Sequence, residues 1–157
     1  MSRHFAFCLL WSILTALTLL IDCLFWNRIL DQKQVVFIAF ASAAGFVAAG
    51  IARLLEPAIS GKRPATARCA TVAILLAGGT MGGSFLGSAA YTVQYFLPWM
   101  APMTSARGLE NLFFFTLSHG YLFAAMAARL FLPLGPFCLF LAAFLYCFLW
   151  PTARNRN

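Results

Sequence analysis

The amino-acid sequence predicts an all-α fold, a polytopic transmembrane helical bundle that forms a single integral membrane domain over residues 1–157. Hydrophobic residues make up 62% of the chain and charged residues only 10%, whereas soluble domains contain about 45–50% apolar and about 25% charged residues. Apolar segments long enough to cross about 30 Å of hydrocarbon follow one another with short polar segments between them. This composition excludes a water-soluble globule, a disordered chain and a secreted module held by disulfides.

The first expected helix covers about 5–26 and carries one acidic residue, Asp22. A secretory signal peptide is the alternative, since Arg3 precedes the apolar run. No small-residue cleavage site closes the run, and Asp22 directly before Cys23 does not suit a lipoprotein-type site. We therefore expect a retained anchor helix.

The second and third expected helices cover about 35–55 and 69–99. The segment from Glu56 to Arg68 is interpreted as the loop between them, because Pro57, Gly61 and Pro64 are typical helix breakers. The third segment is longer than one crossing requires, which indicates a tilted helix or one that extends beyond the lipid.

Residues 111–150 are apolar for about twice the length of one crossing. Two prolines around a glycine in 132–136 predict a tight turn, and hence two helices at about 111–132 and 136–150. The last helix would be only about 22 Å long. We expect five helical segments: four full crossings and a short fifth that either crosses or is re-entrant.

The basic residues and the tryptophans favour different topologies. Five crossings divide the basic residues almost evenly and place Trp26, Trp99 and Trp150 at one interface, as in an aromatic belt. If the chain instead returns to its starting side, the division is seven against three and obeys the positive-inside tendency better. The seven are Arg3, Arg53, Lys62, Arg63, Arg68, Arg154 and Arg156, the three are Arg28, Lys33 and Arg107, and Arg129 is left uncounted. We expect a cytoplasmic N-terminus in a bacterial inner (plasma) membrane, with the number of crossings open.

Small residues at helical spacing form the clearest motif. Gly79, Gly83 and Gly87 stand four residues apart, and Gly78 and Gly82 form an adjacent row. Glycines at this spacing let a second backbone approach closely, which drives helix association inside membranes. The second helix offers a face with the residues Ala41, Gly45 and Ala49. The pattern predicts a tight crossing of the second and third helices, with homo-oligomerisation or a pore-lining role as alternatives.

Three ionisable residues are candidates for intramembrane chemistry: His119, Asp22 and Arg129. His119 falls near the bilayer midplane, about 13 Å along its helix, where ionisable groups are costly and frequently functional. A neutral histidine hydrogen-bonded to another helix is the simpler interpretation. Asp22 could pair with Arg28 or Lys33, or belong to a proton or ion relay, and Arg129 can reach the interface near the end of its helix.

The sequence carries no motif for a cofactor, a metal ion or nucleic acid. The five cysteines include no Cys-x-x-Cys pair, and Lys62, Arg63 and Arg68 indicate topology rather than nucleic-acid binding. The expected partners are the lipid bilayer and either other membrane subunits or further copies of the chain. Most consistent with these features is a non-enzymatic accessory or scaffold subunit. The alternative is a small channel or transporter component that uses His119 and Asp22, and a membrane-embedded enzyme is the third hypothesis.

Overall fold

The computed structural model describes residues 3–25, 31–60, 63–96, 102, 104–131 and 134–149. This part of the chain is all-helical, as predicted, with the order α1 (Arg3–Phe25), α2 (Gln32–Ser60), α3 (Ala65–Phe96), α4 (Ala106–Phe131) and α5 (Leu134–Leu149). Segments of α1, α2 and α3 are long and apolar enough to cross a membrane, and α5 contains a shorter apolar helix. The chain is therefore a membrane protein of helical architecture.

The predicted loop from Glu56 to Arg68 is wrong in its extent. The second helix continues through Pro57 to Ser60, and the third begins at Ala65, so only four residues separate them. Pro57 lies inside this helix, where it lacks the N–H that would donate to the Arg53 carbonyl, and the helix continues for three residues beyond it. The extra turns place Glu56 and Arg68 inside helices, where the two side chains form an ion pair.

Side-chain oxygens that accept hydrogen bonds from backbone N–H groups cap the starts of two helices. The carboxylate of Asp31 accepts a hydrogen bond from the Gln32 backbone N–H (2.6 Å) just before α2. The Ser105 hydroxyl accepts one from the Gly108 N–H (3.0 Å), so α4 begins at Ala106, five residues before the expected start at Asn111. Both caps satisfy N–H groups that have no acceptor within the helix.

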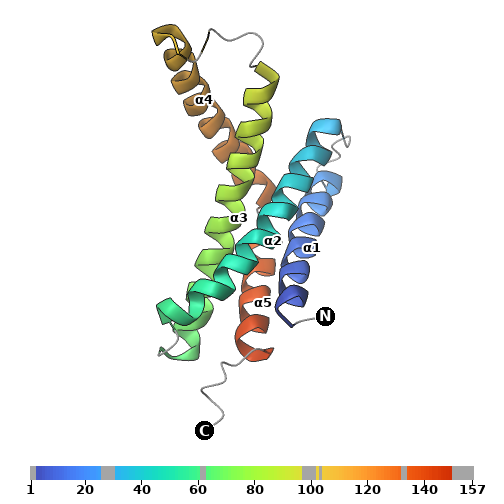
Figure 1. Cartoon of the computed structure of the whole chain (residues 1–157). Coiled ribbons are helices and arrows are strands. Elements are labelled where there is room, and N and C mark those ends of the chain that lie inside the picture. The colour runs from blue at the N-terminus through green and yellow to red at the C-terminus, as the bar shows by residue number, and fades with distance from the viewer. Residues whose placement is uncertain are drawn as a thin grey trace.

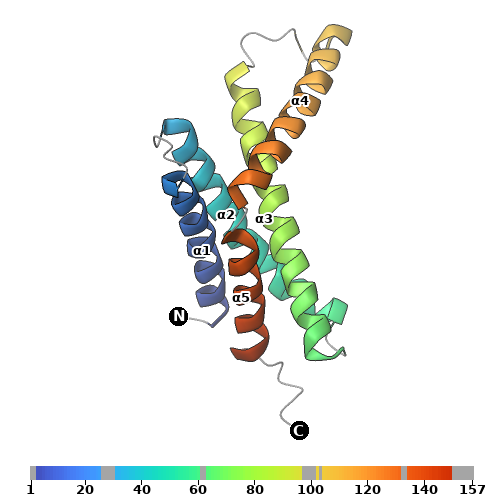
Figure 2. The ribbon, with the colours of Figure 1, turned by 180° about the vertical axis from the view of Figure 1, so that it is seen from behind.

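The path from α4 to α5 differs from the expected tight turn. Figures 1 and 2 show that α4 descends from the upper end of α3 and that α5 starts near the middle of the bundle and continues toward the end where the chain begins. Together α4 and α5 follow α3 back along the molecule in two helical pieces. The ends of α2 and α5 and the starts of α1 and α3 consequently lie at the same end of the bundle.

The helices α2 and α3 cross at backbone contact. A Cβ atom built on Gly79 would lie 2.7 Å from the Ala48 Cβ, and one on Gly83 would lie 2.7 Å from the Ala44 Cβ. One turn further, a Cβ on Gly87 would meet the Phe40 ring at 2.8 Å. Real Cβ atoms do not approach this closely, so glycine at these three positions is required by the distance between the helices.

The face of α2 at this crossing is one residue away from the one expected. Gly45 lies against α1, where its added Cβ would meet the Thr15 hydroxyl at 3.0 Å. Ala41 belongs to a small buried cluster with Leu19 of α1, and Ala49 lies in the main core between helices. The second glycine row, Gly78 and Gly82, has open space around it. Only one of the two rows therefore contributes to the crossing.

The main core lies toward the end of the bundle that holds the chain start. It joins four helices through side chains that are fully or almost fully buried, namely Phe7, Trp11, Ala49, Ala52, Val72, Leu76, Ala142 and Tyr146. A buried hydrogen bond from the Trp11 indole N–H to the Thr80 hydroxyl (2.9 Å) connects α1 to α3. The Ser12 hydroxyl donates to the Ser42 carbonyl (2.9 Å) and connects α1 to α2.

The close crossing makes a prediction about leucine at two neighbouring glycines. Gly83→Leu should lower the free energy of unfolding by about 1–3 kcal/mol or more, because the side chain would overlap Ala44. Gly82→Leu is the matched control, and it should be neutral or slightly stabilising because nothing lies within 4 Å of the added Cβ. Denaturant titration in detergent micelles, followed by tryptophan fluorescence, measures both. Equal effects of the two substitutions would contradict the crossing.

Candidate functional site

His119 connects α4 to α3. Its Nε2 atom lies 3.1 Å from the Ser88 hydroxyl, and its ring packs against Phe85 at 5.8 Å between centroids. Phe115, one turn earlier on α4, stacks on the same ring at 6.0 Å with an interplanar angle of 11°. The side chain is therefore half-buried among aromatic rings with one cross-helix hydrogen bond.

Asp22 and Arg129 are less fully described. Asp22 is buried in α1, with 4% of its surface exposed, one turn after Leu19. Arg28, one of its expected partners, lies outside the described residues, and so do the side chains of Lys33 and Arg129. The structure therefore leaves the pairing of Asp22 and the contacts of Arg129 untested. Neither Asp22 nor His119 lines the two cavities described below.

A buried ion pair between Glu56 of α2 and Arg68 of α3 is the feature that sequence reasoning missed. The Arg68 Nε atom donates to the Glu56 carboxylate at 2.5 Å, and the two side chains are 6% and 0% exposed. Tyr146 of α5 donates its hydroxyl to the other carboxylate oxygen (3.3 Å), and Ser60 donates to the first (3.4 Å). One carboxylate thus holds together α2, α3 and α5 at a single level of the bundle.

Arg53 extends this cluster toward α1. Its guanidinium lies 5.7 Å from the centroid of the Tyr146 ring, and its Nη2 atom lies 3.5 Å from His4. Three buried N–H groups, namely Nε and Nη1 of Arg53 and Nη2 of Arg68, have no hydrogen-bond partner among the described residues. Among the described residues, this cluster holds two arginines, Arg53 and Arg68, and one acidic residue, Glu56, so the net charge of the cluster is positive.

The signal for this cluster is present in the sequence but weak. Glu56 is the only acidic residue between Asp31 and Glu110, and it directly follows an apolar run. An isolated acid beside lipid-length apolar segments indicates a buried partner. The proline next to it favoured the loop interpretation and hid this signal.

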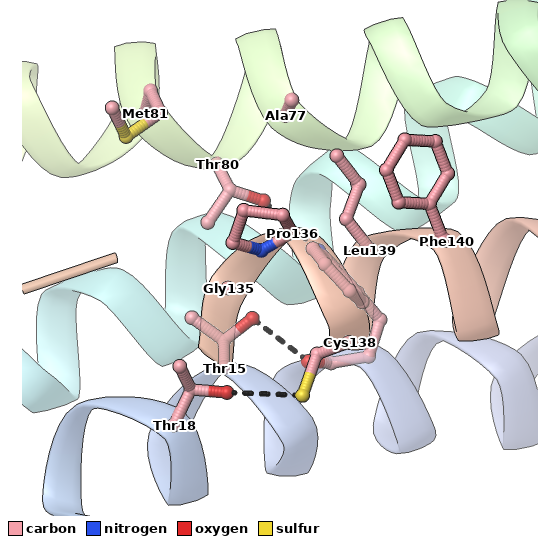
Figure 3. Close-up of a pocket in the computed structure, with 11 residues that line it drawn as sticks. Thr15, Thr18, Ala77, Thr80, Met81, Gly135, Pro136, Cys138, Leu139 and Phe140 are labelled. Atoms are coloured by element: carbon pink, nitrogen blue, oxygen red, sulfur yellow. Dashed lines mark hydrogen bonds between the residues drawn. The ribbon is translucent and has the colours of Figure 1, made fainter. Parts of the chain in front are cut away.

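The first cavity lies inside the bundle, where α5 begins. It has a volume of about 370 Å³ and lies between α1, α3 and α5. Figure 3 shows Thr15 and Thr18 of α1 facing Pro136 and Cys138 of α5, with Thr80 of α3 across the space. Most of the surface of this cavity is apolar. The hydroxyls of Thr15 and Thr18 donate to backbone carbonyls one turn back (2.9 and 2.8 Å).

The second cavity, about 570 Å³, continues between α3 and α5 toward the end of the bundle that holds Arg68. Small residues of α3, including Ala70 and Ala73, face Phe140 and Phe144 of α5. Phe140 lines both cavities. Cys69 and Cys147, which are distant in sequence, both line this cavity.

Among the described side chains, no three histidine, cysteine or acidic residues come close enough together to hold a metal ion. No protein-family model, curated protein or solved structure matches the chain.

The ion pair predicts strong coupling between Glu56 and Arg68. Glu56→Gln alone should lower the free energy of unfolding by about 3–5 kcal/mol, because it leaves Arg68 buried without its counter-charge. The double variant Glu56→Gln/Arg68→Met should recover much of that loss, since the buried charge of Arg68 is removed together with its partner. A double-mutant cycle by denaturant titration measures the coupling, and additive effects would contradict the buried pair.

Proposed function

We propose that the chain is a non-enzymatic subunit of a membrane assembly and that α4 is the helix that binds the partner polypeptide. The observation that carries this proposal is the polar character of the exposed face of α4. Thr116, Ser118 and Tyr121 are exposed there, interleaved with Phe113 and Leu117.

The other helices provide the comparison. The exposed side chains of α5 are all apolar, as expected of a surface that contacts lipid: Leu134, Phe137, Phe140, Leu141, Phe144 and Phe148. Along α1, the exposed residues after His4 are also all apolar. Hydroxyl groups of serine and threonine in a membrane are typical of helix–helix contacts, where they find hydrogen-bond partners. The contrast supports a protein partner at α4 and lipid at α5.

The position of α4 agrees with this role. Its first half diverges from α3 and extends beyond the ends of α1 and α2 (Figures 1 and 2). Between Ala106 and Tyr121, Gly108 is the only buried residue. Among the described side chains of α4, His119 contacts α3, and Phe123 contacts α2 and α3. The described side chains between Ala106 and Tyr121 leave an exposed face for a second polypeptide.

No observation favours the alternative of a channel or transporter component. That function requires His119 and Asp22 to share a polar path. His119 instead lies among aromatic rings at the contact between α3 and α4, and Asp22 lies on the α1 face that also carries Leu19.

The proposed orientation places the chain start in the cytoplasm of a bacterial cell. The start of α1, the end of α2, the start of α3 and the end of α5 lie at one end of the bundle. By their place in the sequence, seven basic residues belong to that end and three to the other. The positive-inside tendency assigns the more basic end to the cytoplasm.

Photocrosslinking tests the partner surface of α4. A benzophenone amino acid placed at Ser118 should crosslink the chain to a different polypeptide in its native membrane, whereas the same group at Phe144 of α5 should crosslink only to lipid. Mass spectrometry of the products distinguishes the two. Lipid adducts alone at Ser118, or adducts only to a second copy of the chain, would contradict the proposal.

Thiol labelling tests the orientation. In a chain without native cysteines, Arg63→Cys and Asn155→Cys should resist a membrane-impermeant maleimide added outside intact cells, and Thr104→Cys should react. Lysed cells provide the control for reactivity. Labelling of Arg63→Cys and Asn155→Cys from opposite sides would show an odd number of crossings after α2 and overturn the proposed topology.

A further inference from the structure

We propose that Cys69 of α3 and Cys147 of α5 form a reversible disulfide when a lipid-soluble quinone oxidises them, and that this bridge locks α5 onto α3. Both cysteines line the second cavity, and both are free thiols in this structure. The described form is therefore the reduced dithiol. The site is separate from the partner surface on α4 and does not depend on it.

The Glu56 carboxylate anchors α3 to α5 beside these cysteines. One carboxylate oxygen accepts a hydrogen bond from Arg68, and the other accepts one from Tyr146 (3.3 Å). Cys69 directly follows Arg68 on α3, and Cys147 directly follows Tyr146 on α5. Each cysteine therefore stands one residue after a side chain that binds the same carboxylate.

The antiparallel arrangement of α3 and α5 leads to the same pairing. The start of α3 and the end of α5 lie at one end of the bundle, so the two helices run in opposite directions (Figures 1 and 2). Ala73 of α3 and Ala143 of α5 both line the second cavity and both pack in the main core. Cys69 stands four residues before Ala73, and Cys147 stands four residues after Ala143. In both helices this step is about one turn toward the same end of the bundle.

Small residues on both helices favour the close approach that a disulfide requires. The Cα atoms of a disulfide are about 4.4–6.8 Å apart, and helices that meet through small side chains can approach closely. Alanine stands one turn from each cysteine at this contact, as Ala73 on α3 and as Ala143 on α5. Because both thiols border one cavity of about 570 Å³, each has free volume into which it can rotate toward the other.

The reaction is the two-electron oxidation of a dithiol. The S–H bonds of Cys69 and Cys147 break and one S–S bond forms. Two electrons and two protons pass to the quinone, whose carbonyl oxygens become the hydroxyls of a hydroquinone. A quinone suits this site because the cavity lies between α3, which is long and apolar enough to cross a membrane, and the apolar helix α5. Exchange with a soluble dithiol returns the pair to the reduced form.

A count of free thiols tests the bridge. A chain that keeps only Cys69 and Cys147 is reconstituted in liposomes and treated with duroquinone, which has no unsubstituted ring position for thiol addition. After denaturation, a polyethylene glycol maleimide should label neither cysteine, and reduction with dithiothreitol should restore both labels. Labelling of both thiols after saturating duroquinone, or a bridge between two chains on a non-reducing gel, would overturn the proposal.

A chain that keeps only Cys69 and Cys138 is the matched control. Cys138 also belongs to α5, but it lines the first cavity, where the Thr18 hydroxyl donates to its sulfur (3.4 Å). Both thiols of this variant should still react with the maleimide after the same treatment. Equal bridging in the two variants would contradict the pairing of Cys69 with Cys147.

The wild-type chain provides a test that needs no substitution. After duroquinone treatment, peptide mapping by mass spectrometry should find Cys69 joined to Cys147, with Cys8, Cys23 and Cys138 as thiols. The oxidised protein should also unfold at a midpoint several degrees higher than the reduced protein, because the bridge closes a long loop and restricts the unfolded chain. A different pairing, or an unchanged midpoint in the bridged protein, would contradict the lock.

Discussion

The backbone contact between α2 and α3 is the constraint on which the arrangement of the other helices depends. In a membrane, helices gain little from hydrophobic association, so close packing and hydrogen bonds between them supply the attraction. Three glycines of α3 face Phe40, Ala44 and Ala48 at distances that exclude a side chain. With this pair held together, α1 packs against the adjacent face of α2 through Gly45, and α5 packs against the α3 face that the glycines leave free.

The polar groups of the molecule lie in three places: at one end of the bundle, in its interior and on the exposed face of α4. At one end, Glu56 of α2 joins α3 through Arg68 and α5 through Tyr146. In the interior, the hydroxyls of Thr15 and Thr18 donate to carbonyls of their own helix, and the Thr80 hydroxyl accepts from the Trp11 indole. The wall of the first cavity is mainly apolar. On α4, Thr116, Ser118 and Tyr121 are exposed, and the Thr116 hydroxyl donates to the Leu112 carbonyl of the same helix (2.8 Å). The cross-link between helices and the proposed partner surface therefore lie in different parts of the molecule.

The sequence was sufficient for the coarse architecture because lipid imposes simple rules on it. Apolar length predicted helical segments, and glycine spacing identified the residues of α3 that contact α2. It did not identify the facing residues, because α2 carries small residues both at Ala41, Gly45 and Ala49 and at Ala44 and Ala48, and spacing alone does not set the rotation of a helix. The Glu56–Arg68 pair and the cavity between α3 and α5 were missed for a related reason: each joins residues from different helices, and their proximity arises only from packing.

The most direct test of the close crossing is to move one methyl group from one helix to the other. Gly83→Ala should destabilise the protein because the new Cβ would lie 2.7 Å from that of Ala44. Adding Ala44→Gly removes the opposing Cβ, so the double variant should be more stable than the sum of the two single effects, with a coupling of about 0.5–3 kcal/mol. Unfolding free energies of the four proteins in one detergent provide the cycle. Additive effects of the two substitutions would show that these residues do not touch and would contradict the packing of α2 on α3.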